Sequence, residues 1–255
     1  MIKSNISIKD GDENMKSYII KIELTGSWPL IWRRVIMPAG ATFNKLHEII
    51  QTVTNFQSRD VREIYHLFEF DLGNLIITNN EEAYLEHQHY KKNKKMYEER
   101  LKTMPEEFLE FEVTYQERLE IEVKKPTTIK VDEYLERNKE FKYNYDFGDG
   151  WEFLIKLEDI VEDYYFGFPT LIDGAETAPP EDVGGLYGFY EFLKIYRDIN
   201  HPEHNETKAW AKSIYFREYD IDFINDILKH IKYKKTEWDK INHIRYNIIE
   251  DKYRK

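Results

Sequence analysis

The chain contains no cysteine among its 255 residues, and this absence removes several kinds of chemistry at once. Disulfide bonds, thiolate metal sites and a cysteine nucleophile are all excluded. No run of 18 apolar residues exists, so the sequence predicts no membrane-spanning helix and no membrane partner. The first 17 residues also lack the apolar stretch of a secretory signal. We therefore expect a cytoplasmic protein in which residues 1–17 form a flexible leader.

Recognisable catalytic motifs are missing as well. The sequence has no P-loop, no dinucleotide fingerprint and no G-x-S-x-G nucleophile elbow. A DFG triplet at Asp146–Gly148 lacks the glycine-rich loop and HRD loop that accompany it in protein kinases. The histidine pairs His87/His89 and His201/His204 do not have the spacing of a helical zinc site. These absences favour a non-enzymatic protein without a cofactor, while leaving enzymatic activity open.

Negative charge dominates the composition, because 48 Asp and Glu outnumber 37 Lys and Arg and give a formal net charge of −11. The charge is unevenly spread, since nine basic and only four acidic residues lie between Lys229 and the end of the chain. An acidic body repels phosphate backbones, so nucleic-acid binding is disfavoured. The basic segment is more typical of a solvated C-terminal helix or tail, which we place at residues 236–255.

Hydrophobic patterns predict an α+β fold. The apolar content of 41% is enough for a substantial core. Apolar residues at helical spacing from Phe43 to Val53 predict a helix capped by Thr42. Alternating patterns predict strands, some joined as hairpins, at residues 18–25, 31–37, 65–70, 74–78, 114–123, 141–147 and 151–160. Further helices are expected at residues 186–198 and 210–215, after Asp220, and from Glu237 onward.

These elements predict a mixed or antiparallel sheet packed with C-terminal helices. The N-terminal order strand, strand, helix, strand (ββαβ), continued by a further strand, is similar to the start of a β-grasp sheet. Residues 80–120 differ from the rest because Glu and Lys are dense there, which predicts a charged helical insertion interrupted at Pro105. No repeat or low-complexity linker divides the chain. We therefore expect one domain over residues 18–235.

Two unusual segments carry the candidate site. They read YNYDFGDGWEF at Tyr143–Phe153 and APPEDVGG at Ala178–Gly185. Between them they supply four carboxylates, those of Asp146, Asp149, Glu181 and Asp182. If the carboxylates converge, they can hold a hard cation or divide acid and base roles. The structural alternative is that the aspartates stabilise turns and the Glu-Asp pair caps a helix.

Glycine, arginine and histidine residues complete the candidate set. Gly184 and Gly185 predict a backbone with positive φ or a close approach of another backbone segment. The loop could present N–H groups to an anion, but the neighbouring carboxylates would repel that anion. Arg33 and Arg34 are expected on opposite faces of their strand, and one of them is a candidate partner for the carboxylates. His66 falls in an alternating strand and is interpreted as a partly buried structural histidine, so no metal ligand is assigned.

Four blocks of the chain occur in the order found in one known family. They read PLIWRRVIMPAGATFNKLHEIIQ from Pro29, YHLFEF from Tyr65, FKYNYDFGDGWEF from Phe141 and GAETAPPEDVGGLYGFYEFL from Gly174. Through these blocks residues 18–230 resemble the plasmid pRiA4b ORF-3-like proteins. The resemblance implies an α+β fold and an uncharacterised bacterial protein, from a family partly associated with plasmids and mobile elements.

The chain departs from the pattern of that family at three positions. Phe153 stands where the hairpin usually has a His, and Ala178 stands where a Cys commonly precedes Pro-Pro-Glu-Asp. Phe68 occupies the place of a second His that often follows His66. A His/Cys metal site implied by the resemblance therefore does not carry over, and aromatic and acidic residues remain.

Three functions are consistent with these observations. We favour a binding or adaptor module whose acidic and aromatic surface holds a protein segment or a cationic ligand, leaving partner and oligomeric state unassigned. The alternative is a metal-dependent hydrolase that acts through clustered carboxylates. A DNA-binding protein linked to mobile elements ranks third. The predicted surface consists of Arg34, Tyr143, Tyr145, Asp146, Asp149, Trp151, Glu181, Asp182, Gly184 and Gly185.

Overall fold

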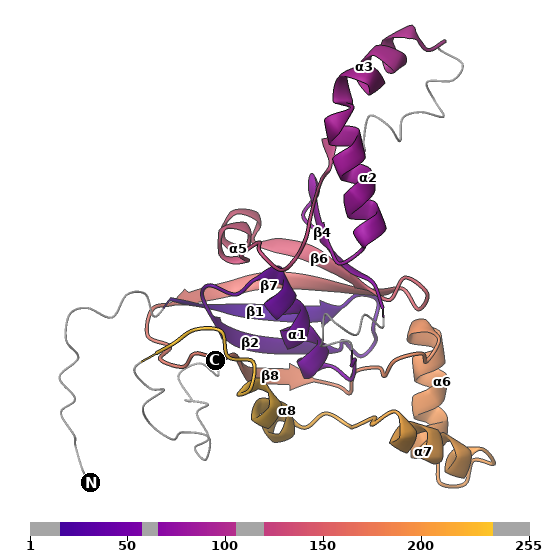
Figure 1. The fold of residues 1–255 in the computed structure, drawn as a ribbon. Coiled ribbons are helices and arrows are strands. Elements are labelled where there is room, and N and C mark those ends of the chain that lie inside the picture. The colour runs from indigo at the N-terminus through magenta and orange to yellow at the C-terminus, as the bar shows by residue number, and fades with distance from the viewer. Residues whose placement is uncertain (1–15, 58–65, 106–119, 237–255) are drawn as a thin grey trace, which may run out of the picture.

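One mixed eight-stranded sheet forms the centre of the computed structural model, which describes residues 16–57, 66–105 and 120–236 (Figure 1). The strand order is β5-β4-β3-β6-β7-β1-β2-β8, with β4 and β5 parallel and the other neighbours antiparallel. The α+β class expected from the sequence is confirmed. The strands are β1 (Ser17–Leu24), β2 (Trp32–Pro38), β3 (Phe68–Asp71), β4 (Leu75–Thr78), β5 (Glu122–Lys124), β6 (Glu140–Tyr145), β7 (Trp151–Val161) and β8 (Thr170–Ala175).

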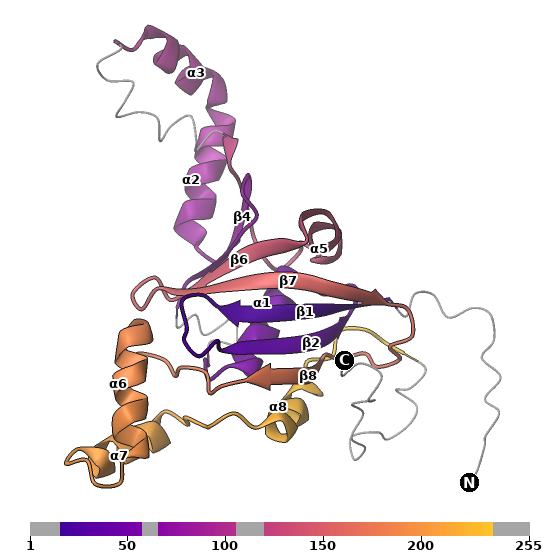
Figure 2. The same cartoon turned by 180° about the vertical axis from the view of Figure 1, so that it is seen from behind.

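Helices lie on one face of the sheet and around its edges (Figures 1 and 2). Within the described residues, none of them is long and apolar enough to cross a membrane. The predicted leader, most of the strand at residues 114–123 and the predicted C-terminal helix fall outside these residues. The helices are α1 (Phe43–Val53), α2 (Glu81–Lys92), α3 (Lys94–Thr103), α5 (Asp132–Asn138), α6 (Gly185–Arg197), α7 (His204–Ser213) and α8 (Ile221–Leu228).

Helix α1 covers one face of the sheet with the apolar stripe that the sequence predicts (Figure 1). Thr42 caps the helix as expected, because its side chain accepts a hydrogen bond from Lys45 N at 3.2 Å. Phe43 and Ile50 are completely buried, and the Phe43 ring lies 5.0 Å from that of Phe70 on β3. Burial of each such side chain stabilises the fold by about 1.5–3 kcal/mol. This burial fixes α1 on the sheet.

The β6–β7 hairpin occupies the middle of the sheet, and its position determines the topology. β1 pairs antiparallel with β7, and β3 pairs with β6. The hairpin therefore separates the first two strands from β3 and β4, although all four precede it in the sequence. Local order along the chain does not reveal such an intervening pair. The β-grasp-like arrangement expected from the N-terminal ββαβ order is not confirmed.

Two helices, α2 and α3, project away from the sheet as an arm (Figures 1 and 2). They lie in the stretch where the sequence predicts a charged helical insertion. Tyr90 is the one residue of these two helices that is buried. Their dense Glu and Lys side chains explain this, because charged groups stay in water unless they are paired.

Strand β8 is the one strand of the described residues that the sequence patterns missed. It pairs with β2 at the edge of the sheet. Asn225 of α8 holds it from one side, donating to Leu171 O at 3.0 Å and accepting from Leu171 N at 2.7 Å. The helix itself begins after Asp220, as predicted, because the Asp220 carboxylate accepts hydrogen bonds from the first turn.

Arg33 is a buried cation that joins three parts of the fold. The residue is 2% exposed, and its guanidinium lies 4.3 Å from the centre of the Tyr219 ring. Burial lowers the pKa of Arg33 to about 10. The guanidinium donates hydrogen bonds of 2.7–2.8 Å to the carbonyls of Trp32, Val53, Ala175 and Glu176. Arg33 thereby ties β2 to the end of α1 and to the residues that follow β8.

We predict that Arg33→Met lowers the free energy of unfolding by about 3–5 kcal/mol, because it leaves several buried carbonyls without donors. Arg34→Met, on the adjacent residue, should cost no more than about 1 kcal/mol, since Arg34 forms a partly exposed ion pair with Glu158. Urea unfolding followed by tryptophan fluorescence measures both values. Equal losses in the two variants would show that the carbonyl contacts of Arg33 do not govern stability.

Candidate functional site

The turn between β6 and β7 holds Asp146 in a defined orientation. Asp146 has a φ of 50°, a left-handed conformation that Asp adopts more readily than most residues. Its Oδ1 accepts a hydrogen bond from Gly148 N at 3.0 Å, and its carbonyl accepts one from Gly150 N at 2.7 Å. The sequence predicted this turn role for Asp. The buried carboxylate also faces groups outside the turn.

Tyr143, Tyr145 and Trp151 point into the core. Their exposed fractions are 0%, 0% and 1%. The Tyr143 hydroxyl lies 2.8 Å from His47 Nδ1 and accepts a hydrogen bond from Gln51 Nε2 at 3.2 Å, and burial raises the pKa of Tyr143. The expected aromatic surface is therefore not formed by these three rings. Alternation along the hairpin turns them toward the core that α1 covers.

The segment that follows β8 brings Glu181 to the end of the hairpin. Asn55, just beyond α1, anchors this segment because its Nδ2 donates to Ala178 O at 2.7 Å. Glu181 is 7% exposed. Its Oε1 accepts hydrogen bonds from Tyr145 Oη at 2.7 Å and from Gln57 N at 2.8 Å. Glu181 is thus linked directly to β6 and to the residues after α1.

His66 lies between the two segments and brings their carboxylates together. Its Nδ1 is 3.4 Å from Asp146 Oδ1, and its Nε2 is 3.7 Å from both Glu181 Oε2 and Asp182 Oδ1. One possible ligand atom from each of His66, Asp146 and Glu181 lies within 4.8 Å of the others. We call these three residues the acidic centre. Two of the four predicted carboxylates belong to it, and the carboxylate of Asp182 lies beside it.

Burial disfavours the charged form of Glu181 in the acidic centre. Its Oε2 is buried and, within the described part of the chain, has no hydrogen-bond donor. Burial is the main reason that the pKa of Glu181 is raised above its usual range, and the nearby Asp182 acts in the same direction. The two hydrogen bonds to Oε1 and the His66 ring oppose this shift. A positive charge placed beside Oε2 would remove much of the cost.

Asp149 and the paired glycines hold the two segments together outside the acidic centre. Asp149 Oδ2 accepts a hydrogen bond from Gly184 N at 3.2 Å. Gly184 and Gly185 have φ values of 83° and 68°, and a Cβ on Gly185 would lie 3.0 Å from Asp149 O. The glycines therefore meet both demands that the sequence suggested, positive φ and a close backbone approach.

Arg34 does not pair with the candidate carboxylates. It forms an ion pair with Glu158, and its Nη1 is 3.8 Å from Asp173 Oδ2. Strand alternation explains this position, because Arg33 occupies the buried face of β2 and Arg34 the opposite face. Neither arginine therefore neutralises the acidic centre. Arg33 binds backbone carbonyls instead.

Sequence reasoning missed the role of His66. The alternating strand pattern around His66 indicates a partly buried structural histidine and does not link it to the four carboxylates. Its carboxylate neighbours belong to segments far along the chain, which meet only after the sheet has formed. The one available signal was that His66 falls in a block shared with the family.

An imidazole nitrogen with two carboxylate oxygens is a ligand set that suits a divalent transition-metal ion. Ligand atoms about 2.1 Å from a tetrahedrally coordinated ion lie about 3.4 Å apart. His66 faces the two carboxylates with different nitrogens, Nδ1 toward Asp146 at 3.4 Å and Nε2 toward Glu181 at 3.7 Å. Because only one imidazole nitrogen can bind a given ion, coordination by all three residues would require the His66 ring or a carboxylate to turn, starting from possible ligand atoms that lie within 4.8 Å of one another. The alternative chemistry of this cluster is an ion pair around a protonated histidine.

The fold and the site define an α+β protein with a centre of one partly buried histidine and two buried carboxylates. The chain belongs to the plasmid pRiA4b ORF-3-like protein family, whose model matches residues 16–226. It is 27% identical over 194 residues to the uncharacterized protein y4hQ of Sinorhizobium fredii. The matched region covers 76% of this chain and 80% of that relative.

A solved structure has a similar fold. The crystal structure of MM3350, a protein of unknown function from Methanosarcina mazei Go1, matches with a TM-score of 0.54 and 26% sequence identity. The match covers 81% of this chain and 96% of that one. The family membership expected from four sequence blocks is confirmed. These relatives are themselves described as uncharacterised or of unknown function.

We predict that Tyr145→Phe raises the pKa of Glu181 further, because it removes a hydrogen bond to the charged carboxylate. NMR titration of ¹³C-labelled Glu side chains measures this value. Tyr143→Phe is the matched control, since the Tyr143 hydroxyl contacts His47 and Gln51 and should leave Glu181 unchanged. An unmoved pKa in Tyr145→Phe, or equal shifts in both variants, would contradict the assignment of this hydrogen bond.

Proposed function

We propose that this protein is a non-enzymatic binding module whose ligand is a divalent cation, held by His66, Asp146 and Glu181. The observation that carries the proposal is the buried Glu181 Oε2, which has no donor among the described residues and faces His66 Nε2 at 3.7 Å. The sequence left two kinds of ligand open, a protein segment and a cation. For the acidic centre, we propose the cation.

A buried carboxylate without a donor is costly for the fold. An unsatisfied buried polar group costs about 1–3 kcal/mol, and more if it is charged. A fold tolerates such a cost where the group has a function, and costly groups of this kind are often found in binding sites. A cation bound beside Oε2 would compensate for the lost hydration of Glu181 and of Asp146 together. Asp182, which is exposed, would add attraction from the solvent side.

The ligand types indicate which ions fit. Imidazole suits zinc, iron, nickel and copper, whereas carboxylates also suit manganese, magnesium and calcium. A set with one nitrogen and two oxygens therefore favours a first-row transition ion such as Mn²⁺ or Zn²⁺ over Ca²⁺. Glu181 is fixed by two hydrogen bonds and Asp146 by its turn, so both carboxylates are oriented before the ion binds.

Metal titration of a Glu181→Gln variant tests the proposal. Wild type should gain about 2.7 kcal/mol of stability when the ion is present at 100 times its Kd. Gln keeps the acceptor for Tyr145 and Gln57 but removes the buried charge. The variant should therefore unfold at the same or a higher temperature without metal and should lose the response to Mn²⁺ and Zn²⁺.

Asp149→Asn is the control for this titration, because it removes a nearby charge outside the acidic centre. That variant should bind the ion as wild type does in calorimetry. A wild-type protein whose melting temperature ignores both ions would refute the proposal. So would a Glu181→Gln variant that responds as strongly as wild type.

A metal-dependent hydrolase is the second candidate, and one feature favours it. Three protein ligands leave a coordination position open, as catalytic zinc sites do. We expect such an activity to appear as metal-dependent turnover of p-nitrophenyl phosphate or acetate, and to vanish in Glu181→Gln. Ion binding without turnover separates the binding module from the enzyme. DNA binding gains no support, because the carboxylates of the acidic centre repel phosphate.

A further inference from the structure

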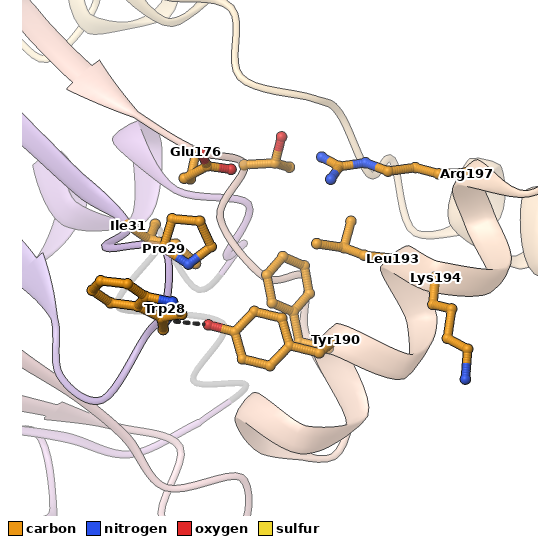
Figure 3. Close-up of a pocket in the computed structure, with 10 residues that line it drawn as sticks. Trp28, Pro29, Ile31, Glu176, Tyr190, Leu193, Lys194 and Arg197 are labelled. Carbon is orange, nitrogen blue, oxygen red and sulfur yellow. Dashed lines mark hydrogen bonds between the residues drawn. The ribbon is translucent and has the colours of Figure 1, made fainter.

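A second feature of the molecule is a groove between the β1–β2 loop and helix α6 (Figure 3). Its volume is about 230 Å³, and no residue of the acidic centre lines it. The groove is therefore independent of the proposed cation. The apolar and aromatic lining consists of Trp28, Pro29, Ile31, Phe189, Tyr190 and Leu193.

Hydrogen bonds fix the two walls of this groove relative to each other. Ser27 Oγ donates to Leu24 O at 2.7 Å and accepts from Ile31 N at 2.9 Å, which closes the loop. Trp28 N then donates to the Tyr190 hydroxyl of α6 at 2.7 Å, the contact drawn in Figure 3. The groove is thus preorganised, which lowers the entropy cost of binding a partner.

Trp28 is the most unusual residue of the groove, because 86% of it is exposed. A single exposed apolar residue is normal on a protein surface, but one that continues into an apolar groove belongs to a contiguous apolar patch, and such patches mark interaction sites. Trp, Tyr and Arg are the residues that contribute most at protein–protein hot spots, and Trp28, Tyr190 and Arg197 all line this groove.

The positive charge of Arg197 at one end of the groove indicates that the partner carries a negative charge. Figure 3 shows Arg197 extending along that end, while Lys194 points away from the groove. Arg197 has no ion-pair partner among the described residues, although the whole chain has a net charge of −11. Glu176 also lines the groove and repels a carboxylate of the partner. The favourable place for that carboxylate is therefore beside Arg197.

We propose that this groove docks an extended segment of a partner protein, with an apolar side chain against Tyr190 and Leu193 and a carboxylate beside Arg197. The carboxylate belongs to an Asp or Glu one to three residues from the apolar anchor. A segment fits better than a small molecule, because the cavity is smaller than the roughly 300–1,000 Å³ typical of small-molecule pockets. Trp28 extends the contact beyond the cavity.

Selection from a random octapeptide library on the purified full chain tests this proposal. We expect the enriched peptides to share an apolar residue with Asp or Glu within three positions. Trp28→Ala should weaken a selected synthetic peptide by about 30-fold or more in fluorescence anisotropy, as loss of a hot-spot residue does. Because Trp28 is so exposed, this variant keeps the fold, which circular dichroism verifies.

Charge reversal gives the sharper readout. Arg197→Glu should lower the affinity of the acidic peptide, and its affinity should return when the acidic residue of the peptide is changed to Lys. Leu85→Ala, an exposed apolar residue on the projecting arm, and Glu181→Gln should both leave the affinity unchanged. This last control distinguishes failure of the groove proposal from failure of the cation proposal.

Three outcomes would overturn the proposal. The first is a selection without a shared acidic residue, and the second is a selected peptide that binds Trp28→Ala as tightly as wild type. The third is concentration-dependent dimerisation in sedimentation that Trp28→Ala abolishes, because the occupant of the groove would then be a second copy of this chain.

Discussion

The buried guanidinium of Arg33 is the constraint on which the arrangement of the other segments depends. It sits where β2 begins, where α1 ends and where the chain leaves β8, and it binds a carbonyl from each of these places. A charge without a carboxylate partner is stable in the interior only if its donors are satisfied, so these carbonyls cannot move apart. The segment leaving β8 at this point then runs past Thr177, which lines the groove, to Glu181, which belongs to the acidic centre. The positions of the groove and of the acidic centre therefore both depend on the carbonyls that Arg33 holds.

The acidic centre shows the opposite use of a buried charge. Arg33 has all its neighbours arranged to satisfy it, whereas Glu181 has one satisfied oxygen and one that lacks a donor among the described residues. Burial disfavours the charged form of both groups, but the hydrogen bonds of Arg33 compensate for the lost hydration, whereas one oxygen of Glu181 is not compensated. Carboxylates of this second kind cluster at functional sites. This contrast between Arg33 and Glu181 supports a functional role for the acidic centre more strongly than the number of nearby carboxylates does.

Most of the helices and strands could be predicted from sequence, because their signals are local, whereas the order of the strands in the sheet could not. Thr42 and Asp220 cap helices that begin where their side chains indicate, and the β6–β7 hairpin follows from its Asp-Gly turn. β8 could not be predicted, since TLIDGA has few strand-forming residues and owes its extended conformation to pairing with β2. The sequence identified the four candidate carboxylates but could not show which of them belong to the acidic centre. Whether Asp146 or Asp149 lies beside Glu181 depends on how segments far apart in the chain pack. The position of His66 beside them depends on the same packing.

Two positions where the chain departs from the family pattern are core positions in this structure. Phe153 is 2% exposed and packs against Tyr143, and Ala178 is 1% exposed with its carbonyl bound to Asn55. Neither contributes to the acidic centre, which His66, Asp146 and Glu181 form without them. Replacing His and Cys by apolar residues leaves this centre with one nitrogen and two oxygens, and without a thiolate. For the cation proposed above, the missing thiolate does not exclude Zn²⁺, because imidazole and carboxylate ligands also bind this ion and sites of nitrogen and oxygen ligands have their lowest affinity for Mn²⁺.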